Sequence, residues 1–179
     1  SMKNKIGYII LGIIVCIFIF SVMILNSNLN ESTVATSVAA MSNKKIGWGI
    51  KRAEKHEQPD LGSNNLKLLH EYDGIAMGNK EDKYVYLTFD NGYEAGYTSK
   101  ILDTLKENNV KAAFFITAHY LNTEPELVQR MINEGHIVGN HTVNHKCLPN
   151  ISDEEIKNEI MNLHNSLYEK LGYEMKFFR

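Results

Sequence analysis

The chain has 179 residues, and its 19 Lys and Arg residues nearly balance its 21 Asp and Glu residues, giving a formal net charge of −2 at pH 7. This length suits one domain with an appended segment, and a near-neutral chain lacks the bulk positive charge that grips nucleic acid, so we expect no such partner. The 44% of hydrophobic residues and only three prolines exclude a largely disordered chain. Two cysteines without a C-x-x-C pair exclude a disulfide framework and a Cys-rich zinc module.

Residues 6–25 form an uncharged apolar stretch with the sequence IGYIILGIIVCIFIFSVMIL. A helix of this length spans about 30 Å, the thickness of the hydrocarbon core of a bilayer. Lys3 and Lys5 precede the stretch and the next basic residue is Lys44, so the positive-inside rule predicts a cytoplasmic N-terminus and an extracytoplasmic remainder. We therefore expect residues 1–25 to be an uncleaved single-pass anchor in the cell membrane. A cleavable signal peptide is the alternative, but its apolar region is typically only about 7–15 residues long.

The residues after the anchor differ in composition along the chain. Residues 26–44 are rich in Asn, Ser, Thr and Ala and show no helical period, which is typical of a flexible tether. Residues 45–82 are mixed, and we expect them to form a lead-in segment that packs on the following unit. From residue 83 to residue 179 the pattern becomes regular and predicts a folded domain.

Strands and helices are expected to alternate over residues 83–179. Short apolar, aromatic or β-branched runs predict four strands, at 84–89, 112–117, 136–139 and 175–178. Apolar residues at helical spacing predict three helices between them, the second starting at a capping box at Thr123 and the third at one at Ser152, with stops at Gly135 and Gly172. This alternation predicts an α/β fold with a parallel sheet. A barrel needs more strands than these, so we expect an open sheet or the front part of a larger domain.

Polar residues follow three of the predicted strands, where parallel α/β proteins place their functional groups. Asp90 and Asn91 end the first strand, His141 and His145 follow the third, and Arg179 follows the fourth. We expect these side chains to gather at one edge of the sheet.

The spacing of His141 and His145 allows one metal ion to meet both imidazoles if the chain turns helically there. An Asp at a strand end more often forms an Asx turn or a helix N-cap, but Asp90 also lies where a carboxylate could meet the histidines. Two imidazoles, a side-chain oxygen and water suit Zn²⁺ or a similar divalent ion with an open coordination position.

The sequences T-F-D-N-G at 88–92 and H-T-V-N-H at 141–145 resemble the first two motifs of the polysaccharide deacetylase family, also called the NodB-homology or carbohydrate esterase 4 family. Those motifs are usually T-F-D-D-G and H-S/T-x-x-H. The blocks at 48–49, 56–60 and 93–94 narrow the resemblance to the delta-lactam-biosynthetic de-N-acetylase branch. That branch removes acetyl groups from N-acetylmuramic acid in spore-cortex peptidoglycan. The resemblance covers about residues 45–179.

The resemblance implies a distorted (β/α) barrel, cut short here after the fourth strand, and a divalent metal ion. Carried over by position, Asp90 is the general base, His141 and His145 hold the metal, and Arg179 orients the catalytic Asp. Asn91 occupies the place of the usual acidic metal ligand, so we expect a more weakly held ion.

The function that follows is metal-dependent hydrolysis of an acetamide on a peptidoglycan strand, outside the membrane. Family motifs that include the general-acid histidine are not in this sequence, and we expect His119 to be a loop or structural residue. Three alternatives remain: a deacetylase of N-acetylglucosamine, a non-catalytic membrane-tethered glycan-binding protein, and a receiver-like domain phosphorylated on Asp90. The predicted anchor and the two histidines disfavour the receiver. We expect no protein partner.

Overall fold

The structure, a computed structural model, describes Ile19, Ser21 and residues 43–179. The chain divides after Lys44 into two units, of which the second comprises Lys45–Arg179. The predicted anchor (1–25) and tether (26–44) lie outside the described part of the chain, apart from Ile19, Ser21 and residues 43–44. Among the residues that are described, no helix is both long enough and apolar enough to cross a bilayer.

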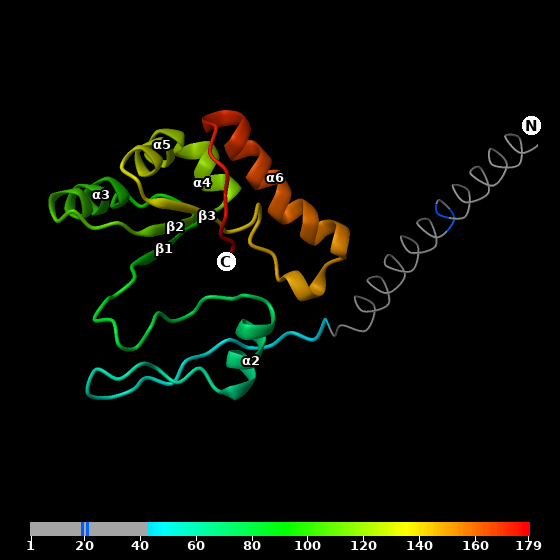
Figure 1. The fold of residues 1–179 in the computed structure, drawn as a ribbon. Helices are drawn as coiled ribbons and strands as arrows, with labels where there is room; N and C mark the ends of the chain where they lie inside the picture. The colour runs from blue at the N-terminus through cyan, green and yellow to red at the C-terminus, as the bar shows by residue number, and fades with distance from the viewer. Residues whose placement is uncertain (1–18, 20, 22–42) are drawn as a thin grey trace, which may run out of the picture. The chain divides into compact units, whose positions relative to one another are not determined.

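The second unit alternates strands and helices in the expected manner (Figure 1). Its elements in chain order are α2 (Ser63–Glu71), β1 (Thr88–Asn91), α3 (Thr98–Glu107), β2 (Ala113–Ile116), α4 (Ala118–Thr123), α5 (Pro125–Asn133), β3 (Ile137–Asn140), a 3₁₀ turn (Leu148–Asn150) and α6 (Asp153–Leu171). The predicted α/β class is therefore confirmed, with a small parallel sheet covered by helices.

The sheet has three parallel strands in the order β1-β2-β3. Its register aligns Asp90 with Phe115 and Phe115 with Gly139. The predicted fourth strand is reduced to one parallel bridge between Phe178 and Asn140. The strands in the described part of the chain form an open sheet and do not close the expected barrel.

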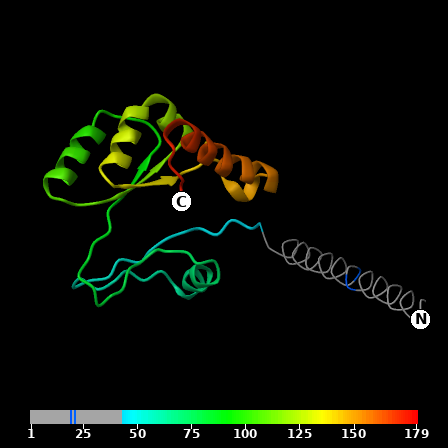
Figure 2. The ribbon, with the colours of Figure 1, turned by 45° about the horizontal axis from the view of Figure 1, so that its top comes forward.

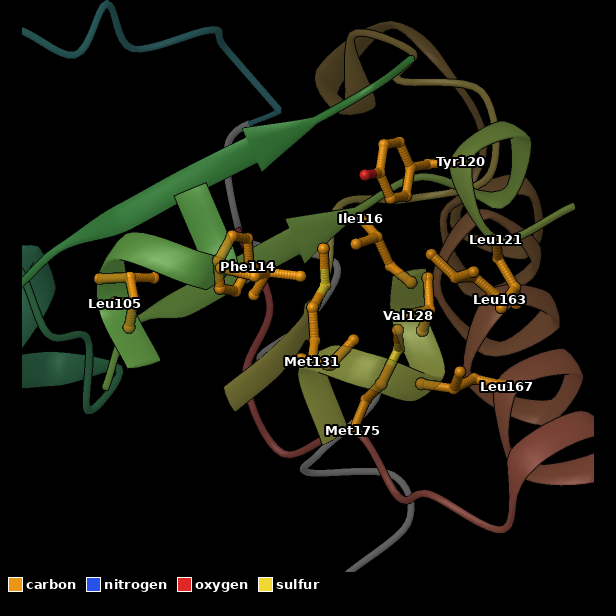
Figure 3. Close-up of a cluster of buried hydrophobic side chains, with 13 residues drawn as sticks. Leu105, Phe114, Ile116, Tyr120, Leu121, Val128, Met131, Leu163, Leu167 and Met175 are labelled. Atoms are coloured by element: carbon orange, nitrogen blue, oxygen red, sulfur yellow. The ribbon is translucent and has the colours of Figure 1, made fainter. Parts of the chain in front are cut away.

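Helices α3, α4, α5 and α6 cover the sheet (Figures 1 and 2), and the hydrophobic core lies between these helices and the sheet. Phe89 stacks on Phe114 with ring centroids 4.9 Å apart. Residues of α5 and α6 complete this core, and Figure 3 shows them converging on the strands: Val128, Met131, Leu163 and Leu167. Because strand residues alternate between faces, Asp90, next to Phe89, points away from this core.

The predicted first strand starts too early. Tyr84, Val85 and Tyr86 are exposed and lie before β1. The register explains the difference, because Thr88 already pairs with the first residue of β2, Ala113, so earlier residues have no neighbouring strand to pair with.

The two predicted capping boxes have different outcomes. The box at Ser152 is confirmed, since its side chain accepts from the Glu155 backbone and the Glu155 side chain accepts from the Ser152 backbone. The box at Thr123 is wrong, because its hydroxyl donates to the His119 carbonyl inside α4, a helix the sequence did not predict. The helix α5 instead begins at Pro125. The lead-in also contains an unpredicted helix, α2.

His136 is buried at the start of β3, where its Nδ1 accepts from the Ala112 backbone N–H at 3.2 Å. Burial, followed by the positive charge of Lys111, lowers the pKa of His136, although Glu134 opposes this shift. A buried imidazole with a lowered pKa binds its proton more readily after unfolding, so its stabilising contribution is complete above its unfolded pKa of about 6.5 and is lost as the pH falls below that value.

We expect the unfolding free energy to fall between about pH 7 and pH 5.5, with a slope from His136 of at most about 1.4 kcal/mol per pH unit. His136→Gln keeps an acceptor for Ala112 but does not titrate, so its slope should be smaller. Urea unfolding of both proteins at several pH values measures the difference between the two slopes. The contributions of the other titrating groups cancel in this difference. Equal slopes would contradict this assignment.

Candidate active site at the carboxyl edge of the sheet

The carboxyl edge of the sheet brings Asp90 and Arg179 together from opposite ends of the domain. The Arg179 guanidinium donates to the Asp90 carboxylate at 2.8 Å and to the Thr88 hydroxyl at 3.1 Å. It also lies 5.0 Å from the centroid of the Phe115 ring, a cation–π distance. Both side chains of the ion pair are 47% exposed, so a substrate can reach the carboxylate. Arg179 therefore fixes the orientation of Asp90 without covering it.

His141 is connected to the same arginine through the backbone. Its Nδ1 lies 2.8 Å from the backbone oxygen of Arg179. Because that oxygen can only accept, Nδ1 carries a proton, and in the neutral ring the lone pair lies on Nε2. An imidazole oriented in this way is the form that binds a metal ion.

The rings of His141 and His145 meet edge to face, with centroids 4.6 Å apart and planes at 62°. Two imidazoles on one tetrahedral zinc ion have centroids about 5 Å apart, so the distance between these rings matches that of two ligands of one ion. The helical turn that the spacing suggested is absent from this described loop. The backbone instead turns through positive φ angles, 67° at Thr142 and 55° at His145, and the Thr142 hydroxyl accepts from the His145 backbone N–H at 2.8 Å.

Asn91 lies farther from the histidines than the sequence suggested. It pairs with Ile116, and Ile116 pairs with Asn140, so one whole strand separates it from His141. With neighbouring strands about 4.8 Å apart, the backbones of Asn91 and Asn140 are about 10 Å apart. The Asn91 Oδ1 is buried and has no hydrogen-bond partner among the described residues. Because strand residues alternate between faces, Asn91 shares the core face of β1 with Phe89 and not the face of Asp90.

The donor set agrees in type with a weakly held divalent ion. Across the described ranges, no group of three or more His, Cys, Asp and Glu side chains is placed to hold a metal. The two imidazoles match such an ion in the distance between their rings, whereas Asn91 offers only a buried oxygen on the face of β1 opposite Asp90. The histidine pair is therefore the part of the predicted metal site that the structure brings together.

Glu94 is a residue of this edge whose role the sequence analysis missed. Its Oε1 accepts from the backbone N–H groups of Gly96 at 2.6 Å and Tyr97 at 2.7 Å, and its Oε2 accepts from the Tyr120 hydroxyl at 2.8 Å. Burial raises the pKa of Glu94, but hydrogen bonds from Thr98, Tyr120 and Gly96 outweigh it and lower the pKa to about 2. The carboxylate thus fixes the turn that follows Asp90 and Asn91.

Glu94→Gln is expected to lower the unfolding free energy by about 1–3 kcal/mol near pH 7, because the amide cannot accept all these bonds. The stabilisation by a carboxylate with a lowered pKa is present above its unfolded pKa and is lost as the pH falls toward about 2. The difference between the two proteins should therefore shrink below about pH 4.5. Chemical denaturation at several pH values measures it, and the exposed Glu107→Gln in α3 is the control. A difference in unfolding free energy that stays constant down to about pH 3 would rule out stabilisation by the ionised Glu94 carboxylate.

The sequence matches the polysaccharide deacetylase family over residues 77–179. The chain therefore belongs to this family, as the two motifs indicated.

Particular relatives are also similar. The peptidoglycan-N-acetylmuramic acid deacetylase PdaA of Bacillus subtilis is 41% identical over 138 residues, which cover 77% of this chain and 52% of PdaA. A peptidoglycan-N-acetylglucosamine deacetylase of Bacillus cereus is 43% identical over 95 residues, covering 53% of this chain and 34% of that protein. The solved structure of Bacillus subtilis PdaA, described as a family 4 carbohydrate esterase, superposes with a TM-score of 0.75 at 40% identity, covering 78% of this chain and 60% of that one. The chain thus spans about half the length of the curated relative PdaA.

Proposed function

We propose that this chain carries the metal-binding and general-base residues of a peptidoglycan deacetylase that acts on N-acetylmuramic acid. The observation that carries the proposal is the convergence on Arg179, whose guanidinium binds Asp90 and whose backbone oxygen orients His141. The N-acetylmuramic acid deacetylase PdaA is 41% identical, which favours the muramic substrate. We further propose that the product leads to the muramic delta-lactam of spore cortex, as the branch resemblance implies.

In the proposed mechanism, His141 and His145 would hold a divalent ion, Zn²⁺, through their imidazole nitrogens, and the Asn91 amide is a third candidate ligand. When bound, the ion polarises the acetamide carbonyl and acidifies water. Asp90 accepts the proton of the attacking water, as a general base that stays within hydrogen-bond reach of the substrate. Arg179 holds the Asp90 carboxylate in place throughout. His119 is exposed in α4, and the proposal gives it no role in proton transfer.

The proposed substrate is a polymer of the cell wall, so the catalytic edge must face outward. We propose that residues 1–25 anchor the protein in the cell membrane and residues 26–44 act as the tether. The lead-in at 45–82 then precedes the deacetylase domain proper, from residue 83.

The related Bacillus cereus N-acetylglucosamine deacetylase supports one alternative, removal of acetyl from N-acetylglucosamine. Incubating the protein and Zn²⁺ with purified muropeptides, followed by tandem mass spectrometry, separates the two. The proposal expects loss of acetyl from the muramic residue alone. Loss from glucosamine favours the alternative, and binding of glycan without release of acetate favours a non-catalytic binding protein.

A further inference from the structure

A buried carboxylate on α6 contacts the loop that carries both histidines. Glu159 is 4% exposed, and acidic side chains are rarely so buried unless they are paired. None of its contacts is to Asp90 or Arg179, so the mechanism above does not use it. Its position between α6 and the histidine loop calls for another role.

Glu159 makes three hydrogen bonds to the centre of the histidine loop and one ion pair with Lys146, which follows it. Its Oε2 accepts from the Asn144 backbone N–H at 2.7 Å and its Oε1 from the Asn144 side-chain amide at 2.8 Å. Its own backbone carbonyl accepts from the Val143 N–H at 2.9 Å. The Lys146 ammonium lies 3.9 Å from Oε1 and forms an ion pair with the Glu159 carboxylate. Burial raises the pKa of Glu159, but the hydrogen bonds from Asn144 outweigh it and the pKa is lowered, so the carboxylate stays ionised.

The loop held in this way is strained. Thr142 and His145 both have positive φ, and for the β-branched Thr142 this conformation is unusual. Such conformations cost about 1–3 kcal/mol each and persist only where surrounding contacts enforce them. Glu159 binds the residues between these two positions, so it stabilises the conformation that brings the rings of His141 and His145 to 4.6 Å.

We propose that Glu159 is a positioning residue that holds His141 and His145 in the geometry that binds the divalent ion. The inference rests on the proposed function, since it concerns the metal site of that reaction. The binding loop is preorganised before the ion arrives, and the affinity for the ion therefore depends on a residue that does not touch it.

Glu159→Gln tests this inference, because a glutamine amide accepts from one Asn144 donor but opposes the other with its own N–H. We expect the affinity for Zn²⁺, measured by competition with a chromogenic chelator, to fall about 10- to 100-fold. The absorption spectrum of bound Co²⁺ should change as well. Glu154→Gln removes the same charge from an exposed position of the same helix and should leave the affinity unchanged.

The double variant N144D/E159Q reverses the side-chain hydrogen bond, because the N–H of the new glutamine donates to the new aspartate. The oxygen of the glutamine still accepts from the backbone N–H of residue 144. It should recover most of the lost affinity. Should E159Q not fold, Glu159→Asp, which withdraws the carboxylate from Asn144 by one methylene, decides by its own Zn²⁺ affinity. Zn²⁺ affinity equal to the unmodified protein in a folded E159Q or E159D variant would overturn the inference. No Zn²⁺ binding by the unmodified protein would instead refute the proposed metal site itself.

Discussion

Asp90→Asn is expected to reduce kcat/KM for removal of acetyl from N-acetylmuramic acid by about 10²- to 10⁴-fold. The Arg179 guanidinium lies 2.8 Å from the Asp90 carboxylate. Asparagine keeps an oxygen for this guanidinium, but it cannot accept a proton from water. The fold and the Zn²⁺ affinity should therefore change little. Acetate release is measured on muropeptides at saturating Zn²⁺.

The matched control is Asp82→Asn, which makes the same change at an exposed position before β1. It should leave acetate release unchanged. If D90N retained full activity, Asp90 would not be the general base, whatever the behaviour of the metal site.

His141→Ala is expected to weaken Zn²⁺ binding by more than about 100-fold, a larger effect than loss of a residue that only supports a ligand. The variant removes one of the two imidazoles and also the bond to the Arg179 backbone oxygen. Activity should be lost in parallel. Equilibrium dialysis with metal analysis measures the bound zinc.

His119→Ala serves as the control for this change, because His119 is an exposed histidine of α4 without a role in the site. Its zinc content should match that of the unmodified protein. A full zinc content in H141A would contradict the assignment of His141 as a ligand.

Much of the fold could be predicted from local sequence patterns. The Ser152 box fixes the start of α6 through bonds within four residues, and Gly172 ends it with a φ of 66°. The short helix α4 was missed because Thr123, a typical N-cap residue, uses its hydroxyl inside the preceding turn. Competing local bonds of this kind are invisible in the pattern of residue types.

The polar residues of the site could be selected because they follow strands whose ends share one edge of a parallel sheet. The contacts that hold them could not. Glu94 binds Tyr120, 26 residues away, and Glu159 binds Asn144, 15 residues away. These pairs depend on how the helices pack, and no spacing within either segment encodes them.

The most direct test of the account is a crystal structure of the zinc-bound protein with anomalous diffraction data collected at the zinc edge. The account predicts one ion bonded to Nε2 of His141 and to a ring nitrogen of His145 at about 2.0–2.1 Å, with the Asp90 carboxylate facing the ion's open coordination position. An ion bound elsewhere, or by one of the two rings with the other turned away, would contradict it.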